Sequence, residues 1–127
     1  MNAYGAAPTS AYRESSVLTA PPELLVLMLY DGINRFLLQA TVAMRDGNVA
    51  LSNTKLQRAE AIVDELIATL DHDAGGQIAD RLNAIYLYSR RTLIDARIEK
   101  SPEKIEHVQG LIAEIRDSWA QMCGGAE

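Results

Sequence analysis

The stretch from Ile78 to Ile98, IADRLNAIYLYSRRTLIDARI, decides the fold that this sequence predicts. Wound as an α-helix at about 100° per residue, it gathers apolar side chains on one face, with Tyr86 at the edge of that face. The members of this face are Ile78, Leu82, Ile85, Leu93 and Ala96. A second apolar stripe, on roughly the opposite side, consists of Leu87, Ile94 and Ile98. Because a helix of a small bundle buries only one side within its own chain, the second stripe predicts a partner, either another copy of the chain or a different protein.

Length and composition place the chain among ordinary globular domains. Its 127 residues are enough for one domain with a single core. The formal net charge of −5, without a basic stripe, argues against nucleic acid or an anionic membrane as a partner. The longest apolar run, Leu24 to Tyr30, is far shorter than the roughly 20 residues of a membrane span, and the N-terminus lacks a signal-peptide pattern. We therefore expect a soluble protein with no direct membrane insertion.

Helix start and stop signals divide the rest of the chain. Pro21 and Pro22 suit the first turn of a helix, with Thr19 or Ala20 as its cap, and Gly47-Asn48 and Ser101-Pro102 suit two later helix boundaries. We expect helices over about 21–45, 49–70, 76–99 and 102–122, with the turn from Asp71 to Gly76 separating the second from the third. Short loops imply antiparallel neighbours, so residues 21–123 predict an all-α, antiparallel up-down four-helix bundle. Residues 1–20 read as a flexible N-terminal arm and 124–127 as a disordered tail.

The first helix, like the third, is apolar on two sides. Its predicted core face consists of Leu29, Ile33, Phe36, Leu37, Ala40 and Met44, and its outer stripe of Leu24, Leu27, Met28, Leu38 and Val42. Asp31 and Arg35 interrupt the outer stripe and are spaced to pair with each other. Gly32 costs roughly 1 kcal/mol relative to alanine, which suggests that a neighbour approaches the backbone there.

The second and fourth helices are apolar on one side only. The second carries a heptad seam, and the fourth a similar stripe. These two sets are Leu56, Ala59, Val63, Leu66 and Leu70, and Ile105, Val108, Ile112, Ile115 and Trp119.

The sequence offers little for catalysis or metal binding. His72 and His107 do not form the Glu-x-x-His pairs of metal-binding bundles, and Cys123 has no base in a fixed site nearby. From these residues we expect no metal, no cofactor and no enzymatic activity.

Two pairs of residues in the third helix leave alternatives open. Arg90 and Arg91 could clamp a dicarboxylate in a small all-helical enzyme, although pairing with carboxylates on nearby turns of the same helix is the commoner arrangement. Tyr86 and Tyr88 suit the rim of a protein interface, where an amphipathic ring is half-wet. Equally, Tyr86 suits a core edge with a hydrogen-bonded hydroxyl, and Tyr88 a surface ring.

Short motifs along nearly the whole chain resemble one family in their order, although no single motif is specific. They are Ala11-Tyr12; Pro21-x-Glu23-Leu24; Met28-Leu29-Tyr30-Asp31-Gly32; Gly47-Asn48; Gly75-Gly76-x-Ile78-Ala79 with Leu82; Ile85-Tyr86-x-Tyr88-x-Arg90-Arg91-x-Leu93; Ala96; and Arg116-Asp117-x-Trp119. This ordered set resembles the FliS family, the flagellin-specific export chaperones of bacterial flagella. Ala20 and Ser89 depart from the family, which often has a capping serine and a methionine at these positions.

The resemblance implies a four-helix bundle that binds the C-terminal segment of newly made flagellin in the bacterial cytosol. The bound segment would be kept from polymerising and delivered to the flagellar type III export gate. The competing interpretation is a self-associating bundle with no flagellin client, and the apolar stripes also allow a weak homodimer.

The residues expected to bind the partner are those of the outer stripes, with two tyrosines as rim contacts. They are Leu24, Leu27, Met28, Leu38 and Val42 on the first helix, Leu87, Ile94 and Ile98 on the third, and Tyr86 and Tyr88 at the rim. Tyr12 resembles the family's arm tyrosine, which implies a role in covering the groove or contacting the export gate.

Overall fold

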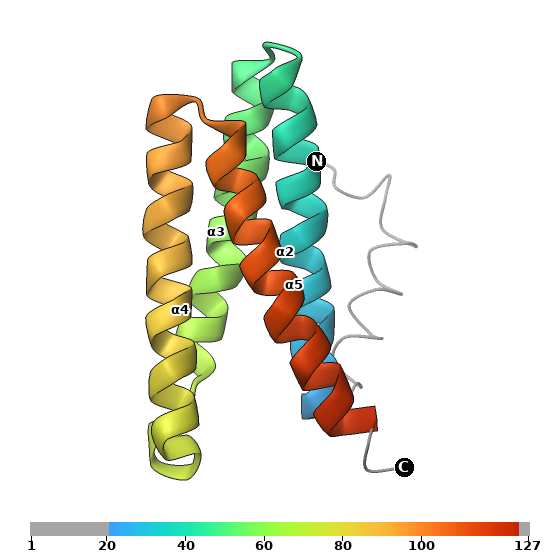
Figure 1. Ribbon diagram of the computed structural model, residues 1–127, viewed down its shortest axis with the longest axis vertical. Coiled ribbons are helices and arrows are strands. Elements are labelled where there is room, and N and C mark those ends of the chain that lie inside the picture. The colour runs from blue at the N-terminus through green and yellow to red at the C-terminus, as the bar shows by residue number, and fades with distance from the viewer. Residues whose placement is uncertain (1–20, 125–127) are drawn as a thin grey trace, which may run out of the picture.

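The computed structural model describes residues 21–124, which form four helices and no strand. The helices are α2 (Pro22–Arg45), α3 (Val49–Thr69), α4 (His72–Glu99) and α5 (Pro102–Gly124). They form a ring in which α2 packs against α3 and α5, and α4 packs against the same two helices. Successive helices run in opposite directions (Figure 1). The predicted all-α, antiparallel up-down four-helix bundle is confirmed, while the predicted arm at 1–20, with Tyr12, lies outside the described residues.

Side-chain caps begin three of the four helices. In each, a side-chain oxygen accepts a hydrogen bond from the backbone N–H three residues later, which satisfies one of the donors left free in a first helical turn. The caps are Asn48, Asp71 and Ser101, with distances of 3.1, 3.0 and 3.3 Å. In contrast, α2 has no side-chain cap, because Pro21 and not Thr19 or Ala20 stands at the N-cap position. Pro22 in the first turn compensates, since proline has no N–H to satisfy there and its φ is already helical.

The third helix starts earlier than the sequence predicted. α4 begins at His72, within the stretch expected to be a turn, and its first turn is separated from the rest by Gly76, which has φ 51° and ψ −125°. A glycine adopts such a backbone conformation at little cost, so one capped helical turn forms before the chain bends into the long helix.

The core is built from one face of each helix. The seams predicted along α3 and α5 are confirmed at Leu56, Ala59, Val63, Leu66, Ile105, Val108 and Ile112, all of which are buried. On α2, Tyr30 is fully buried, and Leu29 is only partly so. The sequence pattern predicts Leu29 for the core because it ranks residues by apolarity, and a tyrosine is less apolar than a leucine.

The face that α4 buries is rotated from the predicted one. It consists of Ala79, Tyr86, Ser89, Thr92, Leu93 and Ala96. Ile78 is 61% exposed, and Ile85 is half-buried. Ile78 and Ile85 line the space between α4 and α5 instead, which an apolar periodicity within one helix does not reveal. The predicted core assignments of Ile78 and Ile85 were therefore wrong.

Contacts between α2 and its neighbours settle two further expectations. A Cβ atom at Gly32 would lie 3.3 Å from Ile62 Cδ1 of α3, so a neighbour does approach the backbone there. The predicted pairing of Asp31 with Arg35 is wrong, since the Asp31 carboxylate accepts a hydrogen bond of 2.9 Å from Arg116 Nε of α5. Asp31 therefore links two helices instead of two turns of one helix.

None of the helices in residues 21–124 combines the length and apolar character needed to cross a bilayer.

Candidate functional site

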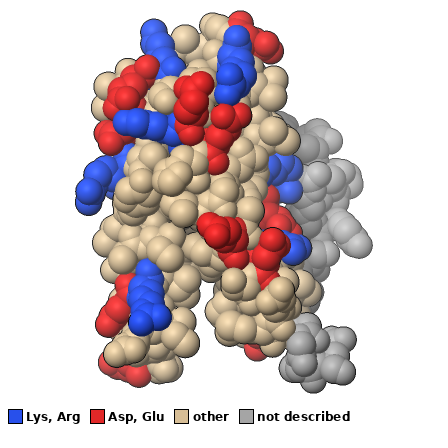
Figure 2. Space-filling view, viewed as in Figure 1, with Lys and Arg blue, Asp and Glu red and all other residues tan. Residues whose placement is uncertain are grey.

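The most distinctive surface of the bundle is a groove between α4 and α5. The two helices diverge toward the end of the bundle that holds the α3–α4 loop (Figure 1), and the molecular surface is hollowed between them (Figure 2). The groove has a volume of about 330 Å³, and Glu114 and Ser118 supply its polar lining. Its apolar lining comes from both helices and consists of Ile78, Leu82, Ile85, Leu111, Ile115, Trp119 and Met122.

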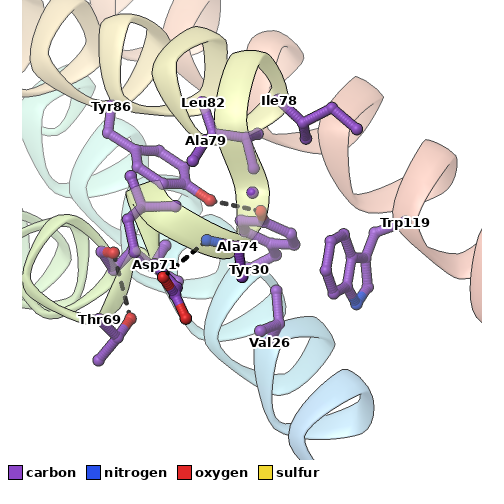
Figure 3. Close-up of a pocket in the computed structure, with 13 residues that line it drawn as sticks. Val26, Tyr30, Thr69, Asp71, Ala74, Ile78, Ala79, Leu82, Tyr86 and Trp119 are labelled. Atoms are coloured by element: carbon purple, nitrogen blue, oxygen red, sulfur yellow. Dashed lines mark hydrogen bonds between the residues drawn. The ribbon is translucent and has the colours of Figure 1, made fainter.

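A second cavity of about 330 Å³ opens at the same end into the interior of the bundle (Figure 3). All four helices line it, with Val26 from α2, Leu66 and Leu70 from α3 and its capping loop, Leu82 from α4, and Trp119 from α5. Groove and cavity share Ile78, Leu82 and Trp119, so they are continuous. We call the two together the terminal trough. Its lining is Val26, Leu66, Leu70, Ile78, Leu82, Ile85, Leu111, Ile115, Trp119 and Met122.

Two aromatic contacts hold the inner end of the terminal trough. The hydroxyl oxygens of Tyr30 and Tyr86 lie 2.5 Å apart, which joins α2 to α4 across the core (Figure 3). Burial raises the pKa of both hydroxyls, and for Tyr30 the hydrogen bond to Tyr86 offsets part of that rise. The Trp119 Nε1–H donates to the backbone oxygen of Glu23 at 2.9 Å, which ties α5 to the start of α2. The trough therefore has a fixed, uncharged floor and open apolar walls.

The outer stripes predicted from the sequence lie on the outside of the bundle. On α4, Leu87 and Ile98 are exposed, Ile98 to 73%, and Ile94 is half-buried. On α2, three stripe residues are exposed and two are half-buried; these are Leu24, Leu38 and Val42, and Leu27 and Met28. Because α2 and α4 sit diagonally in the ring, the two stripes face different directions.

The structure separates the two candidate rim tyrosines. Tyr86 is 2% exposed and belongs to the core, so the prediction that it is a partly exposed residue at the rim of an interface is wrong. The structure agrees with the other interpretation, in which Tyr86 belongs to the core and its hydroxyl is hydrogen-bonded. Tyr88 is exposed, and its hydroxyl oxygen lies 3.0 Å from Nε2 of His107 on α5. Of the pair, only Tyr88 is available to a partner.

The terminal trough itself was missed by the sequence reasoning. Ile78, Leu82 and Ile85 were assigned to the core, and Ile115 and Trp119 to the apolar stripe of the last helix. A signal was present, because α4 carries apolar residues on three sides, which is more than one core face and one outer stripe require. The sequence could not reveal that α4 and α5 separate and leave these side chains facing a groove.

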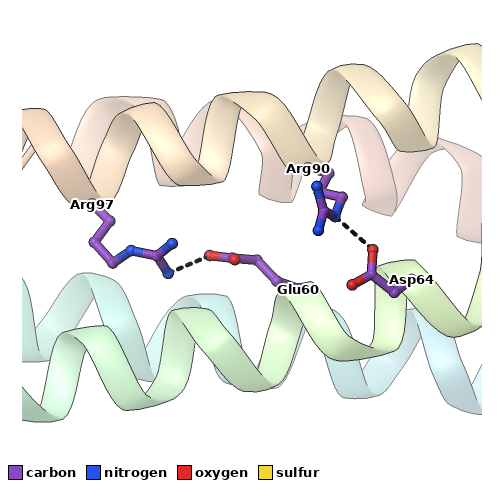
Figure 4. Close-up of polar contacts among 4 residues, drawn as sticks. All are labelled: Glu60, Asp64, Arg90 and Arg97. Atoms are coloured by element: carbon purple, nitrogen blue, oxygen red, sulfur yellow. Dashed lines mark hydrogen bonds and ion pairs between the residues drawn. The ribbon is translucent and has the colours of Figure 1, made fainter.

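Polar groups are arranged as links between helices. Arg90 Nε donates to Asp64 Oδ1 at 2.6 Å, and Arg97 donates to Glu60 Oε2 at 2.7 Å, so two ion pairs join α4 to α3 (Figure 4). Arg90 therefore does not pair within its own helix and does not form a clamp with Arg91. Burial raises the pKa of Glu60, and the Arg97 charge counteracts part of that rise. Within residues 21–124, no group of three His, Cys, Asp or Glu side chains is placed to hold a metal ion.

Comparison with known proteins identifies the family. A family model described as flagellar protein FliS matches residues 5–126. A relative from Salmonella typhimurium is 37% identical over 110 residues, which cover 86% of this chain and 82% of the relative. A relative from Bacillus subtilis is 33% identical over 114 residues (90% and 84%), and one from Escherichia coli is 32% identical over 123 residues (93% and 90%).

All three relatives carry the name flagellar secretion chaperone FliS, which describes a chaperone and not an enzyme. The match extends over nearly the whole chain, and the four-helix bundle is the fold that the resemblance implied. This chain belongs to the FliS family of flagellar proteins.

Proposed function

We propose that this chain, a flagellar export chaperone by its family, binds the C-terminal segment of flagellin in the bacterial cytosol. The bound segment is thereby kept from polymerising until it is delivered to the flagellar export gate. The observation that carries the proposal is the amount of apolar surface left open on a bundle whose core is already complete. That surface comprises the terminal trough and the outer stripes of α2 and α4.

The chemistry of this surface suits a segment that folds on binding. An amphipathic helix needs a long apolar surface, and the groove between α4 and α5 has apolar walls contributed by two helices. A segment of this kind typically buries 1,000–3,000 Å² and loses about 2–5 kcal/mol to ordering, so that the complex can still be taken apart at the gate. The trough, with Thr69, Asp71, Glu114 and Ser118 among its lining residues, supplies mainly apolar contact.

The directions of the surfaces favour a client that wraps around the bundle. The α2 stripe and the α4 stripe face different sides, and the trough opens at one end. One straight helix cannot contact all three, so we expect at least two client helices joined by a turn. Tyr88, exposed beside the groove between α4 and α5, serves as a rim contact in this arrangement.

The test uses a fluorescent peptide with the sequence of the flagellin C-terminal segment from the same bacterium and measures its anisotropy. Leu87→Asp with Ile98→Asp places charges on the α4 stripe, and Ile78→Asp with Met122→Asp places them in the trough. All four side chains are exposed, so circular dichroism should remain unchanged. Each pair of substitutions is expected to weaken binding about tenfold or more.

Val49→Asp with Leu51→Asp is the matched control for the trough substitutions, because these apolar side chains are also exposed but lie at the end of the bundle opposite the terminal trough. It should alter affinity by less than about twofold. Light scattering measures the oligomeric state of the chain and so tests the alternative of a self-associating bundle with no flagellin client. A tight dimer of the chain that ignores the peptide, and that the same substitutions split into monomers, would overturn the proposal.

A further inference from the structure

The surface where α2 and α3 meet carries a cluster of three cations around one aromatic ring. Phe36 of α2 is half-buried against the core. Arg35 Cζ, Lys55 Nζ and Arg58 Cζ lie 5.9, 5.7 and 5.9 Å from the centroid of its ring. These distances fall within the range in which a cation is attracted to the face of an aromatic ring. We call Arg35, Lys55 and Arg58 the cation cluster.

The geometry concentrates positive charge in a small area. Since each cation is less than 6 Å from the same centroid, any two lie within about 12 Å of each other, which is shorter than the Debye length of about 30 Å at roughly 0.01 M ionic strength. The three charges therefore repel one another measurably. Phe36 offsets part of this repulsion, and bound carboxylates would relieve the rest.

Ion pairs between helices hold several other arginines of the described surface. Arg45, Arg90, Arg97 and Arg116 each form an ion pair with a carboxylate on another helix. No carboxylate within residues 21–124 forms an ion pair with a member of the cation cluster. Arg81, Arg91 and Lys100 also form no ion pair within residues 21–124, so what distinguishes the cation cluster is that three positive charges gather around one ring in a chain whose formal net charge is −5.

The backbone beneath the cluster supports this arrangement. Gly32 lacks a side chain, and an added Cβ would lie 3.3 Å from Ile62 Cδ1 and 3.9 Å from a terminal nitrogen of Arg35. The bare backbone therefore brings α3 close to α2 and lets the Arg35 guanidinium lie against its own helix. The close approach places cations from two helices around a single ring.

We propose that the cation cluster is a docking site for an acidic segment of a partner protein. Guanidinium groups bind carboxylates through paired, charge-assisted hydrogen bonds, and the half-buried ring of Phe36 offers apolar contact between them. A polyanion such as nucleic acid, or a flat anionic membrane, would extend beyond the cluster and be repelled by a chain whose formal net charge is −5, so a short acidic segment fits better.

The cation cluster is separate from the terminal trough, although Arg35 lies within the outer stripe of α2 that is also proposed for the client. The α2–α3 side of the ring lies opposite the groove between α4 and α5. A partner on the cation cluster and a client in the terminal trough can therefore be bound together. The inference does not depend on flagellin binding and would stand if the client were a different protein.

The test titrates the full-length chain with a fluorescent, end-blocked helical peptide of about 16 residues that presents a row of glutamates, and follows its anisotropy. Saturable binding is expected at roughly 20 mM NaCl, with weaker binding at roughly 300 mM. The triple variant Arg35→Gln, Lys55→Gln, Arg58→Gln should weaken binding about tenfold or more.

The matched control is Arg81→Gln, Arg91→Gln, Lys100→Gln, which changes the net charge equally at exposed sites elsewhere. It should keep the affinity within about twofold of the unsubstituted chain. Equal weakening by both triple variants, equal binding of a glutamine version of the peptide, or no saturable binding would each overturn the proposal. Binding to vesicles that contain phosphatidylserine, lost with the same three residues, would instead assign the cluster to a membrane.

Discussion

Two glycines within helices of this bundle have opposite surroundings. A Cβ at Gly32 would press on Ile62 at 3.3 Å, whereas one at Gly110 would meet no atom within 4 Å. Gly110→Ala is therefore expected to raise the free energy of unfolding by about 0.5–1 kcal/mol, through the higher helix propensity of alanine. Gly32→Ala should raise the free energy of unfolding distinctly less, because the Ile62 side chain must shift. Urea denaturation measures the free energy of unfolding of both variants. An equal increase in the two would contradict the close approach of α3 to the α2 backbone at Gly32.

Ser89 and Thr92 differ in how their buried hydroxyls are satisfied. Thr92 Oγ1 donates to the backbone oxygen of Tyr88 at 2.8 Å, while the hydroxyl of Ser89 has no hydrogen-bond partner in residues 21–124. Ser89→Ala removes a desolvated polar group and should leave the free energy of unfolding unchanged or raise it by up to about 1 kcal/mol. Thr92→Val, which keeps the shape, should lower it by about 1 kcal/mol. Thermal and urea denaturation measure both, and destabilisation by Ser89→Ala would reveal a hydrogen bond that the serine makes.

The Tyr30–Tyr86 pair predicts how stability depends on alkaline pH. Burial raises the pKa of both hydroxyls above 10.0, their ordinary value, so the folded chain keeps protons that the unfolded chain releases above that pH. Their contribution to the free energy of unfolding is therefore complete below about pH 10 and falls as the pH rises further. Urea denaturation between about pH 8 and 12 should show this loss, and the Tyr30→Phe, Tyr86→Phe variant should show a smaller one. An identical pH profile for the two chains would contradict the assignment.

At the scale of the helix pair, α3 and α4 are joined by ion pairs of unequal burial. Glu60 and Arg97 have side chains 12% and 25% exposed, whereas Asp64 and Arg90 are 50% and 44% exposed. Exposed pairs contribute about 0–1 kcal/mol, because water and salt screen them. A half-buried pair is screened less, although both of its charges lose hydration.

Double-mutant cycles should therefore give a larger coupling energy for Glu60 with Arg97 than for Asp64 with Arg90. The substitutions are to alanine, singly and together, and the measurement is the free energy of unfolding at low and high salt. The Asp64–Arg90 coupling should shrink more on adding salt. Equal couplings with equal salt dependence would show that burial does not distinguish the two pairs.

At the scale of the whole molecule, the bundle is tight at one end and open at the other. The terminal trough leaves Ile78 and Met122 more than half exposed, and the cavity beside it reaches into the interior. Regions with few buried apolar contacts open locally at lower free energy than the rest of a protein. The unequal ends therefore imply unequal local stability along the same helices.

Amide hydrogen exchange should reveal this gradient. Amides that flank the trough, in the first turns of α4 and the last turns of α5, are expected to exchange faster than those around Leu93 and Val108, which are fully buried. Adding the flagellin C-terminal peptide should slow exchange most at the trough and less along the outer stripes of α2 and α4, because the trough is the part of the client surface that opens most easily and the client supplies its missing apolar contacts. Uniform protection along α4 and α5 in the free chain would argue that the open end is as stable as the core.

Local signals in the sequence were sufficient for the architecture. Asn48 and Ser101 cap helices as predicted, because a cap depends on a side chain and a backbone N–H three residues apart. The seams of α3 and α5 follow from a periodicity that any one-sided helix must have. The ordered motifs also pointed to the FliS family, to which the chain belongs.

Tertiary structure alone decided which surfaces remain open. Whether Ile78 lies in a core or in a groove depends on how far α4 and α5 separate, and that distance is set by the packing of all four helices together. Asp31 could have bonded within its helix, but Arg116 of α5 lies closer in space. The cation cluster likewise exists only because α2 and α3 pack side by side and place cations from both helices around Phe36. A sequence pattern describes the faces of one helix at a time, whereas a trough or a cluster is a relation between helices.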